Sequence, residues 1–479
     1  MILSKLNEYW PGICAAAAIA GLLILVIRYK LHAFIALVGV SLMLGLAAGL
    51  PPGRVIDEIS KGIGNILADV ALLLAFGALL GRMLEVSGAA ELIARRMIGA
   101  LGQGNASFAL LLAAFLIGIP MLFNVGFLLL IPIVWRMQRE TNQSLLRFLL
   151  PFVFSLGVTH SLVPPHPGIV GAVIAIAGRE ESNRVMVETI IYGIALSFPM
   201  VLIGWFGPGR IWANRQFVTP PENMSIADEK KEPPIARSLT LALIIVLAPL
   251  VLSITGFGAK VLFDLNRLPE RMTWTLFGTD EIPVYFYWLN HSPLDWLLFF
   301  GKPTVALGVP TVLAYVCYGT RRGWSHAQMS KITSDSLIEV GAMMFLFGAA
   351  GGFKEVIVAT GVGRFIAGEM MQLSLSPVAI SFCMAAIIRI ALGSATASIL
   401  TASALLTSLA AQRPGFETLI VLSVACGVTV GTQPADSGFW MLKEYGNLST
   451  SDVMLRINGC RLTMALSGLG ILLIVEAFI

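Results

Sequence analysis

The sequence predicts an all-α integral membrane protein made of two inverted repeats, and three observations lead to this prediction. Of the 479 residues, 57% are hydrophobic and only 13% are charged, whereas soluble domains average about 25% charged residues. Apolar runs of about 20 residues, the length that crosses a bilayer, recur along the whole chain. GVTHSLVPPHPG at 157–168 and GVTVGTQPADSG at 427–438 share a Gly-Val-Thr start, a proline at the eighth place and a glycine at the twelfth.

Uninterrupted and interrupted apolar segments alternate along the chain. Uninterrupted runs predict membrane-spanning helices at 12–28, 31–50, 66–86, 185–206, 238–254, 294–319, 334–352 and 457–478. Gly, Pro and polar residues interrupt the others, which predict re-entrant hairpins at about 104–137 and 377–411 and broken helices at about 147–178 and 415–446. Paired interrupted helices in two halves of a chain are typical of secondary transporters.

A second internal similarity supports the repeat. FGALLGRMLEVSGAAELIARRM at 76–97 matches FGAAGGFKEVIVATGVGRFIAGEM at 347–370 with a two-residue insertion. Each repeat is expected to hold about five transmembrane helices, one re-entrant hairpin and one broken helix. The predicted division is a first repeat at 1–206, a polar cytoplasmic linker at 207–237, a second repeat at 238–479 and an irregular insertion at 255–293 within it.

Basic residues predict the orientation, because Lys and Arg near span ends favour the cytoplasm. With the N-terminus outside, the predicted cytoplasmic segments carry the basic clusters 28–30, 95–96, 136–147, 210–237 and 321–331. The first hairpin then opens to the cytoplasm and the second to the outside, so the halves are inverted. The first apolar run lacks a strongly basic start and another span follows it, so we expect no cleaved signal.

Several other classes of function find little support in the composition. The five cysteines stand singly without metal-ligand spacing, so neither a metal site nor a cofactor is expected. The net charge of +4 comes without a sustained basic patch, which argues against nucleic acid as a partner. An intramembrane enzyme would need a nucleophile or a metal cluster, and neither is evident. A channel is possible in principle, but inverted repeats favour alternating access.

The interrupted segments predict a binding site. Non-helical backbone at membrane depth persists only where protein or an aqueous cavity supplies its hydrogen-bond partners. The N-terminus of a half-helix also presents free N–H groups and a partial positive charge that suit an anion. The candidate substrate-binding residues are Asn124, Thr159, His160, Ser161, His166, Gly393, Ser394, Thr396, Thr432, Gln433, Asp436 and Ser437.

Each candidate also has a structural alternative. A proline kink would explain either break alone, and Ser or Thr in membrane helices often bonds back to its own helix. Asp436 and His160 are the candidate ion-coupling residues, because a carboxylate at membrane depth is costly and an imidazole can relay protons. His166, set between prolines, is rather a hydrogen-bonded structural histidine. Asp69, Glu339 and Arg389 are further intramembrane candidates, although each could merely pair with a neighbouring charge.

At these residues the sequence resembles the gluconate permease (GntP-type) family of gluconate–proton symporters. The matching motifs are FGALLGRMLEVSGAAELIA (76–94), NVGFLLLIP (124–132), VTHSLVPPHPG (158–168), RIALGSATAS (389–398) and DSGFWMLKEY (436–445). The resemblance covers nearly the whole chain. It implies an elevator-type transporter of the bacterial inner membrane, with a mobile domain containing the hairpins and broken helices, a static scaffold and a homodimeric assembly in lipid.

Three single residues and one longer stretch depart from the pattern of that family. Asn124 stands where the family usually has an acid, Gln433 and Ala435 stand where it often has His and Asn, and RINGCRLTMALSG (456–468) replaces a final span containing Thr and Glu. We therefore expect a secondary active transporter that imports gluconate or a related small hydroxylated monocarboxylate by cation symport, with H⁺ as the coupling ion. The alternative is a Na⁺-coupled transporter of another organic anion, since an amide oxygen can coordinate Na⁺ but cannot titrate.

Overall fold

The computed structural model describes residues 2–221, 236, 238–264, 291–365, 368, 376–434 and 436–479. Throughout these residues the regular secondary structure is helical, without a strand, which confirms the predicted all-α class. Eight of the helices in the described ranges are long and apolar enough to cross a membrane. Residues 222–235 and 237 of the predicted linker and residues 265–290 of the predicted insertion lie outside the described residues.

The N-terminal part of the chain contains nine α-helices among the described residues. They are α1 (Ile2–Ile27), α2 (Ala33–Ala47), α3 (Pro52–Val86), α4 (Ala89–Leu101), α5 (Ala106–Gly118), α6 (Phe123–Thr141), α7 (Leu146–Leu162), α8 (Pro167–Gly204) and α9 (Arg210–Arg215). The helix α3 starts well before the predicted span at 66–86, because Pro52 occupies its first position, where the missing N–H costs nothing.

The C-terminal part is also helical in its described residues. It holds α10 (Leu239–Asp264), α11 (Pro293–Gly301), α12 (Pro303–Ala314), α13 (His326–Thr360), α15 (Pro377–Leu392), α16 (Ala395–Ala411), α17 (Glu417–Val428), α18 (Ser437–Tyr445) and α19 (Asn458–Glu476). The prediction of one span at 294–319 was wrong. Lys302 is extended there and Pro303 opens a new helix, because a proline disfavours helical backbone in the residue before it.

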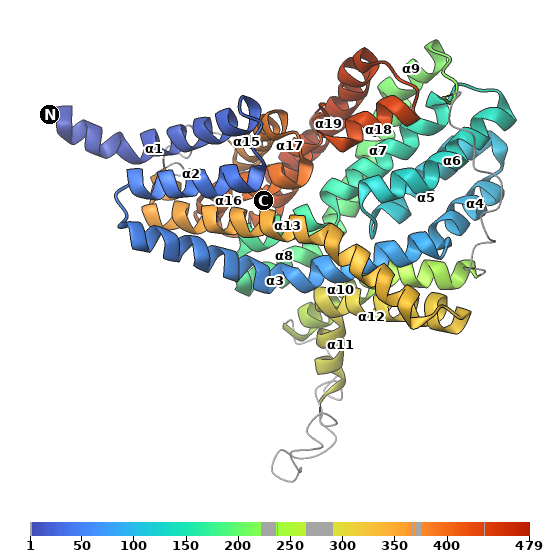
Figure 1. Ribbon diagram of the computed structural model, residues 1–479, viewed down its shortest axis with the longest axis horizontal. Helices are drawn as coiled ribbons and strands as arrows, with labels where there is room; N and C mark the ends of the chain where they lie inside the picture. The colour runs from blue at the N-terminus through green and yellow to red at the C-terminus, as the bar shows by residue number, and fades with distance from the viewer. Residues whose placement is uncertain are drawn as a thin grey trace, which may run out of the picture.

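The helices α1, α2, α3 and α13 run side by side through one part of the molecule, whereas α4, α5, α6 and α7 gather at the other end (Figure 1). The two long helices α3 and α13 meet through glycines. A Cβ on Gly62 would lie 2.3 Å from the carbonyl oxygen of Gly351, so the two backbones touch where any side chain would collide. Small residues allow this kind of close approach between membrane helices.

Four interruptions lie close together in the middle of the molecule. Residues 119–122 separate α5 from α6, and 163–166 separate α7 from α8. Between α15 and α16, Gly393 adopts a left-handed conformation with φ of 77°, which glycine accepts without steric cost. The described residues of the segment 429–436 separate α17 from α18. These breaks fall inside the segments where the sequence shows Gly, Pro and polar interruptions.

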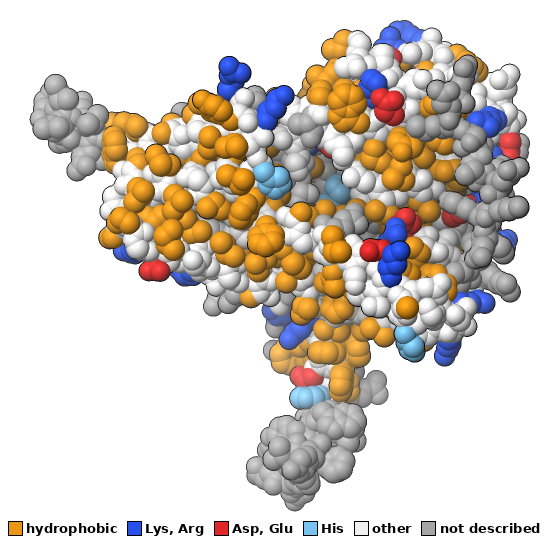
Figure 2. All heavy atoms as spheres, viewed as in Figure 1, with side chains coloured by type: hydrophobic (Ala, Val, Ile, Leu, Met, Phe, Trp, Pro, Cys, Tyr) orange, Lys and Arg blue, Asp and Glu red, His pale blue; other side chains and the backbone are white. Residues whose placement is uncertain are grey.

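Apolar side chains cover much of the surface in Figure 2, most densely over the end of the molecule that carries α1, α2 and α13. Met43 on α2 and Ile338 on α13 are 70% and 76% exposed. Extended apolar surface of this kind would promote aggregation in water, but it matches the hydrocarbon of a bilayer. Its place on long apolar helices makes the chain a multi-pass membrane protein.

Candidate functional site

The four interruptions surround a cavity of about 350 Å³, a volume within the range of small-molecule sites. Hairpin tips, broken helices, α13 and α19 all contribute to its wall. The lining residues are Leu122, Phe123, Asn124, Gly157, His160, Ser161, Met343, Arg389, Ser394, Ala395, Thr396, Asp436, Ser437, Gly438 and Arg461. The cavity therefore joins segments that lie more than 300 positions apart in the sequence.

Arg389 lies in the last turn of α15 and is only 2% exposed. Its Nε donates a hydrogen bond to the carbonyl oxygen of Gly431 at 3.0 Å. One terminal nitrogen donates to the carbonyl oxygen of Gly393, and the other forms an ion pair with Asp436. The guanidinium thus ties the tip of the second hairpin to the second break, and it satisfies backbone carbonyls that the interrupted helices leave unpaired.

Asp436 is the residue that starts α18. Its Oδ1 accepts a hydrogen bond from the backbone N–H of Gly438 at 3.0 Å, which caps the helix. Its Oδ2 accepts from the hydroxyl of Thr432 at 3.1 Å and from Arg389. A half-buried carboxylate with these partners is held in one orientation, and its charge is matched by a neighbouring cation.

Two residues of α19 complete the second break, and neither was predicted as a site residue. The side-chain amide of Asn458 makes two hydrogen bonds to the backbone of Thr432, each of 2.8 Å. Three residues further, Nε of Arg461 donates to the carbonyl oxygen of Thr429 at 3.3 Å. The signal that could have found them is an arginine and an asparagine at (i, i+3) on one face of an apolar helix.

The rings of His160 and His166 lie against each other, tilted by 49°. The ring centroids of His160 and His166 are 3.4 Å apart, and the Nδ1 of His160 accepts a hydrogen bond from the backbone N–H of Phe123 at 3.2 Å. Because that nitrogen accepts, the ring carries at most the proton on Nε2 and is neutral in this arrangement. His160 lines the cavity, whereas His166 points elsewhere.

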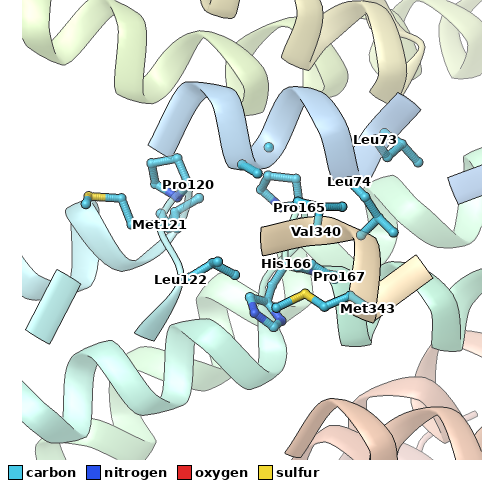
Figure 3. Close-up of a pocket in the computed structure, with 13 residues that line it drawn as sticks. Leu73, Leu74, Pro120, Met121, Leu122, Pro165, His166, Pro167, Val340 and Met343 are labelled. Carbon is cyan, nitrogen blue, oxygen red and sulfur yellow. The ribbon is translucent and has the colours of Figure 1, made fainter. Parts of the chain in front are cut away.

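His166 lies against a separate apolar pocket of about 20 Å³, shown in Figure 3 with Pro120, Met121, Leu122 and Met343. The side chain is 3% exposed, and neither ring nitrogen has a hydrogen-bond partner among the described residues. The predicted alternative of a hydrogen-bonded structural histidine was therefore wrong for the groups that the structure describes. His166 instead fills apolar space behind His160.

The first hairpin and the second break meet directly. The hydroxyl of Ser437 donates to the side-chain oxygen of Asn124 at 3.3 Å, and both residues line the cavity. Opposite them, Ser394 caps α16 by accepting a hydrogen bond from the N–H of Ala397 at 3.3 Å. Thr396 follows in the first turn of that helix. Seven of the predicted substrate-binding residues share this wall: Asn124, His160, Ser161, Ser394, Thr396, Asp436 and Ser437.

The other five predicted residues do not line the cavity, and the contacts of each explain why. The Thr159 hydroxyl bonds back to the carbonyl oxygen of Ser155 at 2.9 Å and lies against Gly118. Gly393 supplies a turn and a carbonyl acceptor, while Thr432 is buried and directs its hydroxyl to Asp436. The Gln433 amide points at the Arg389 carbonyl, 3.5 Å away, and His166 lies behind His160.

Of the other intramembrane candidates, Asp69 lines a second cavity of about 220 Å³ between α3, α8 and α13, together with Lys354 and Glu355. Lys61 of α3 pairs with Glu355 at 3.1 Å. The charged residues that line this second cavity are two carboxylates and one lysine, whereas the first is lined by two arginines and one carboxylate. The side chain of Glu339 lies outside the described residues.

The electrostatics of the first cavity favour an anion. The N-terminal ends of three helices face it, namely α6 through Phe123 and Asn124, α16 through Ser394 to Thr396, and α18 through Asp436 to Gly438. Each helix start carries about half a positive charge in its free N–H groups. Two arginines and one carboxylate also line the wall. The charged side chains sum to one positive charge, and the helix ends add to it.

An apolar multi-pass protein with a charged internal cavity at interrupted helices falls into the class of membrane transport proteins. Comparison with known proteins specifies the class further. The family model described as "GntP family permease" matches residues 10–478. The chain belongs to the GntP permease family, which confirms the resemblance found in the sequence motifs and makes the protein a permease rather than an enzyme.

Individual relatives agree with that assignment. A gluconate permease of Pseudomonas aeruginosa is 32% identical, with 96% of each chain covered. The Gnt-II system L-idonate transporter of Escherichia coli is 32% identical over 93% of this chain and 94% of its own. The solved structure of the YdaH transporter of Alcanivorax borkumensis has a TM-score of 0.65 and 13% identity, covering 93% of this chain and 98% of that one. That likeness concerns the fold.

Proposed function

We propose that this permease imports gluconate or a closely related hydroxylated monocarboxylate by symport with H⁺. The observation that carries the proposal is the cavity in which two arginines, one carboxylate and three helix N-termini converge. Such a site attracts an anion, and its small hydroxyl and amide groups suit a chain of sugar hydroxyls. The relatives named as transporters of gluconate and of L-idonate support the same substrate class.

Polar groups around the cavity fit a hydroxylated chain. Asn124 and Ser437 of the first hairpin and α18, Ser394 and Thr396 of α16, and Ser161 of α7 all line the cavity. Each offers a donor or an acceptor at the wall. A site that hydrogen-bonds substrate hydroxyls rejects analogues without them, because its own groups would then stay unpaired.

Ion coupling is assigned to Asp436 and His160. Both line the cavity, His160 in the last turn of α7 and Asp436 immediately before α18. Proton binding to Asp436 would weaken its pair with Arg389, and proton binding to His160 would displace the hydrogen bond that its Nδ1 accepts from Phe123. Na⁺ coupling is the competing assignment, in which Asn124 would supply an amide oxygen.

The proposed transport cycle is an elevator movement. The hairpins and broken helices would form the moving part, and α3 and α13 with their neighbours the static part. The two halves 1–206 and 238–479 would be inverted repeats joined by a cytoplasmic linker, with the N-terminus outside the bacterial inner membrane. Two copies would assemble in the lipid bilayer. Labelling of single cysteines from either side of the membrane tests this orientation.

Uptake of radiolabelled gluconate into proteoliposomes tests the function. An inward proton gradient and an inward Na⁺ gradient are applied in turn, and we expect accumulation with the first only. Accumulation with Na⁺ alone would contradict the coupling ion, and no gluconate uptake under either gradient would contradict the substrate. Undiminished proton-driven uptake in Asp436→Asn and His160→Ala variants would remove both residues from the coupling step.

A further inference from the structure

The two arginines of the cavity differ in how their guanidinium groups are used. Arg389 directs all three of its nitrogens at protein acceptors, namely the carbonyl oxygens of Gly431 and Gly393 and the carboxylate of Asp436. Arg461 makes one hydrogen bond, from Nε to the carbonyl oxygen of Thr429. Its two terminal nitrogens donate to no group in the described part of the chain. The guanidinium of Arg389 is thus fully used in contacts within the protein, whereas the two terminal nitrogens of Arg461 are available to a ligand.

We infer that Arg461 binds the carboxylate of the transported anion and that its unmatched charge restricts the substrate to one negative charge. This inference rests on the proposed function. A planar guanidinium with two free terminal nitrogens matches the two oxygens of a carboxylate in a bidentate pair. Arg461 is half-buried at the cavity wall, so a ligand reaches it without entering the protein core.

The apolar surroundings of Arg461 increase the energetic effect of its positive charge. On the side away from the cavity it borders a small void lined by Val153, Phe154, Val158 and Met464. These apolar groups offer no counter-charge, and a low local dielectric strengthens any electrostatic contact made there. An unpaired positive charge at this place is costly, so a bound carboxylate relieves it.

The charged and titratable groups that face Arg461 from the packed elements are few. Arg389 of α15 and Asp436 at the start of α18 form a pair and cancel. His160 of α7 accepts a hydrogen bond at Nδ1 and is neutral in this arrangement. One positive charge therefore remains. A monoanion neutralises it, a neutral sugar leaves it exposed to apolar surroundings, and a dianion brings a second negative charge with no partner.

Three six-carbon ligands that differ mainly in charge test this inference. Gluconamide is neutral, gluconate carries one negative charge and glucarate carries two. Binding to the purified full-length protein is measured by thermal stabilisation and by competition with radiolabelled gluconate. For the wild type we expect gluconamide and glucarate each to bind at least tenfold more weakly than gluconate. In Arg461→Gln we expect gluconate affinity to fall at least tenfold and the preference over gluconamide to disappear.

Two further variants separate charge from folding. Arg461→Lys keeps the charge but loses the bidentate geometry, so it should retain the preference for gluconate over gluconamide at reduced affinity. Arg413→Gln is the matched control, because Arg413 is an exposed arginine between α16 and α17, away from the cavity. It should behave like the wild type. The preference is a ratio measured on one variant, so a partly inactive preparation does not change it.

The outcomes distinguish this inference from the proposed function. An unchanged preference for gluconate over gluconamide in Arg461→Gln would overturn the role of Arg461 and leave gluconate transport standing. If the wild type binds lactate or glycerate but not gluconate, and Arg461→Gln loses that binding, the substrate is wrong and the role of Arg461 holds. Absence of binding by all the monocarboxylates would overturn both, and equal binding of glucarate would overturn the charge limit.

Discussion

The two breaks start from similar sequences but are stabilised by different physical interactions. The second break, around 429–436, is held by charge and hydrogen bonds, in which Arg389, Asp436 and Asn458 engage its backbone and side chains. The first break, at 163–166, consists of Val-Pro-Pro-His and packs His166 into apolar space. Prolines have no N–H to satisfy, so this turn needs fewer partners. The two similar sequence stretches thus contain one apolar turn and one charged turn.

The comparison places the charged side chains of the cavity wall in the second half. There the cavity receives Arg389, Asp436 and Arg461, whereas the first half contributes His160, Ser161 and Asn124. A sequence repeat thus predicts where the chain breaks but does not require that both breaks bind the same group. The following variants test the difference, from the largest expected effect to the smallest.

Asp436→Asn should have the largest effect, because it leaves the buried guanidinium of Arg389 without a counter-charge. Removing one partner of a buried pair costs about 3–5 kcal/mol, and we expect uptake to fall by more than a hundredfold. Denaturant unfolding and proteoliposome uptake measure the two effects. Asp57→Asn is the control, since Asp57 is exposed near the start of α3.

The double variant Arg389→Gln/Asp436→Asn sharpens this result. It removes both charges, so it should recover part of the lost stability without recovering uptake. A single Asp436→Asn protein as stable as the wild type would show that the ion pair does not hold the second break.

Asn458→Ala should have the next largest effect on stability and uptake. The variant leaves the N–H and the carbonyl oxygen of Thr432 without their partners, and each unsatisfied buried group costs about 1–3 kcal/mol. We expect about a tenfold loss of uptake, measured against Asn447→Gly, in which an exposed asparagine with a φ of 49° loses one hydrogen bond to Thr219 and glycine keeps the left-handed backbone. Equal loss in both variants would mean that the second break does not depend on its contact with α19.

Asn124→Ala removes the hydrogen bond between Asn124 of the first hairpin and Ser437 of α18. The bond is long, at 3.3 Å, and both side chains are exposed, so stability should not change measurably. We expect a reduction of gluconate affinity by a few fold, because one polar group leaves the wall. The measurement is competition binding, and a loss above a hundredfold would place Asn124 at the centre of the site.

His166→Leu should have the smallest effect. Neither ring nitrogen has a partner in the described structure, and replacing unsatisfied polar groups with apolar ones of similar size is nearly neutral or stabilising. Uptake under a proton gradient should stay within about threefold of the wild type. Abolished proton-driven uptake with intact gluconate binding would instead make the adjacent histidines His160 and His166 a proton path.

Much of the fold could be predicted from the sequence, because apolar length and Gly or Pro interruptions act locally. The breaks between α5 and α6 and between α7 and α8 lie where Pro120, Pro164 and Pro165 prevent continuous helix. The division of 294–319 at Pro303 was missed, because the apolar run continues across it and hydropathy alone does not detect a change of direction.

The site was harder to predict, since it depends on which way side chains point. Thr159 and Ser161 are two positions apart, yet Thr159 faces α5 and Ser161 faces the cavity. Arg461 and Asn458 were missed because they stand in an uninterrupted helix, and only packing brings that helix to the second break. A charged residue in an apolar segment was a usable signal for a site residue, because both Arg389 and Asp436 line the cavity.

Met343 differs from the other residues of the cavity wall, because it alone comes from α13, the long helix that crosses α3 at Gly62 and Gly351. In an elevator cycle this thioether would stay with the static part while Arg461 travelled with the ligand. A sugar acid extended by an apolar tail could then bind Arg461 through its carboxylate and contact Met343 through its tail at the same time. Such a compound would inhibit the permease by trapping it in one conformation, which would also help structure determination.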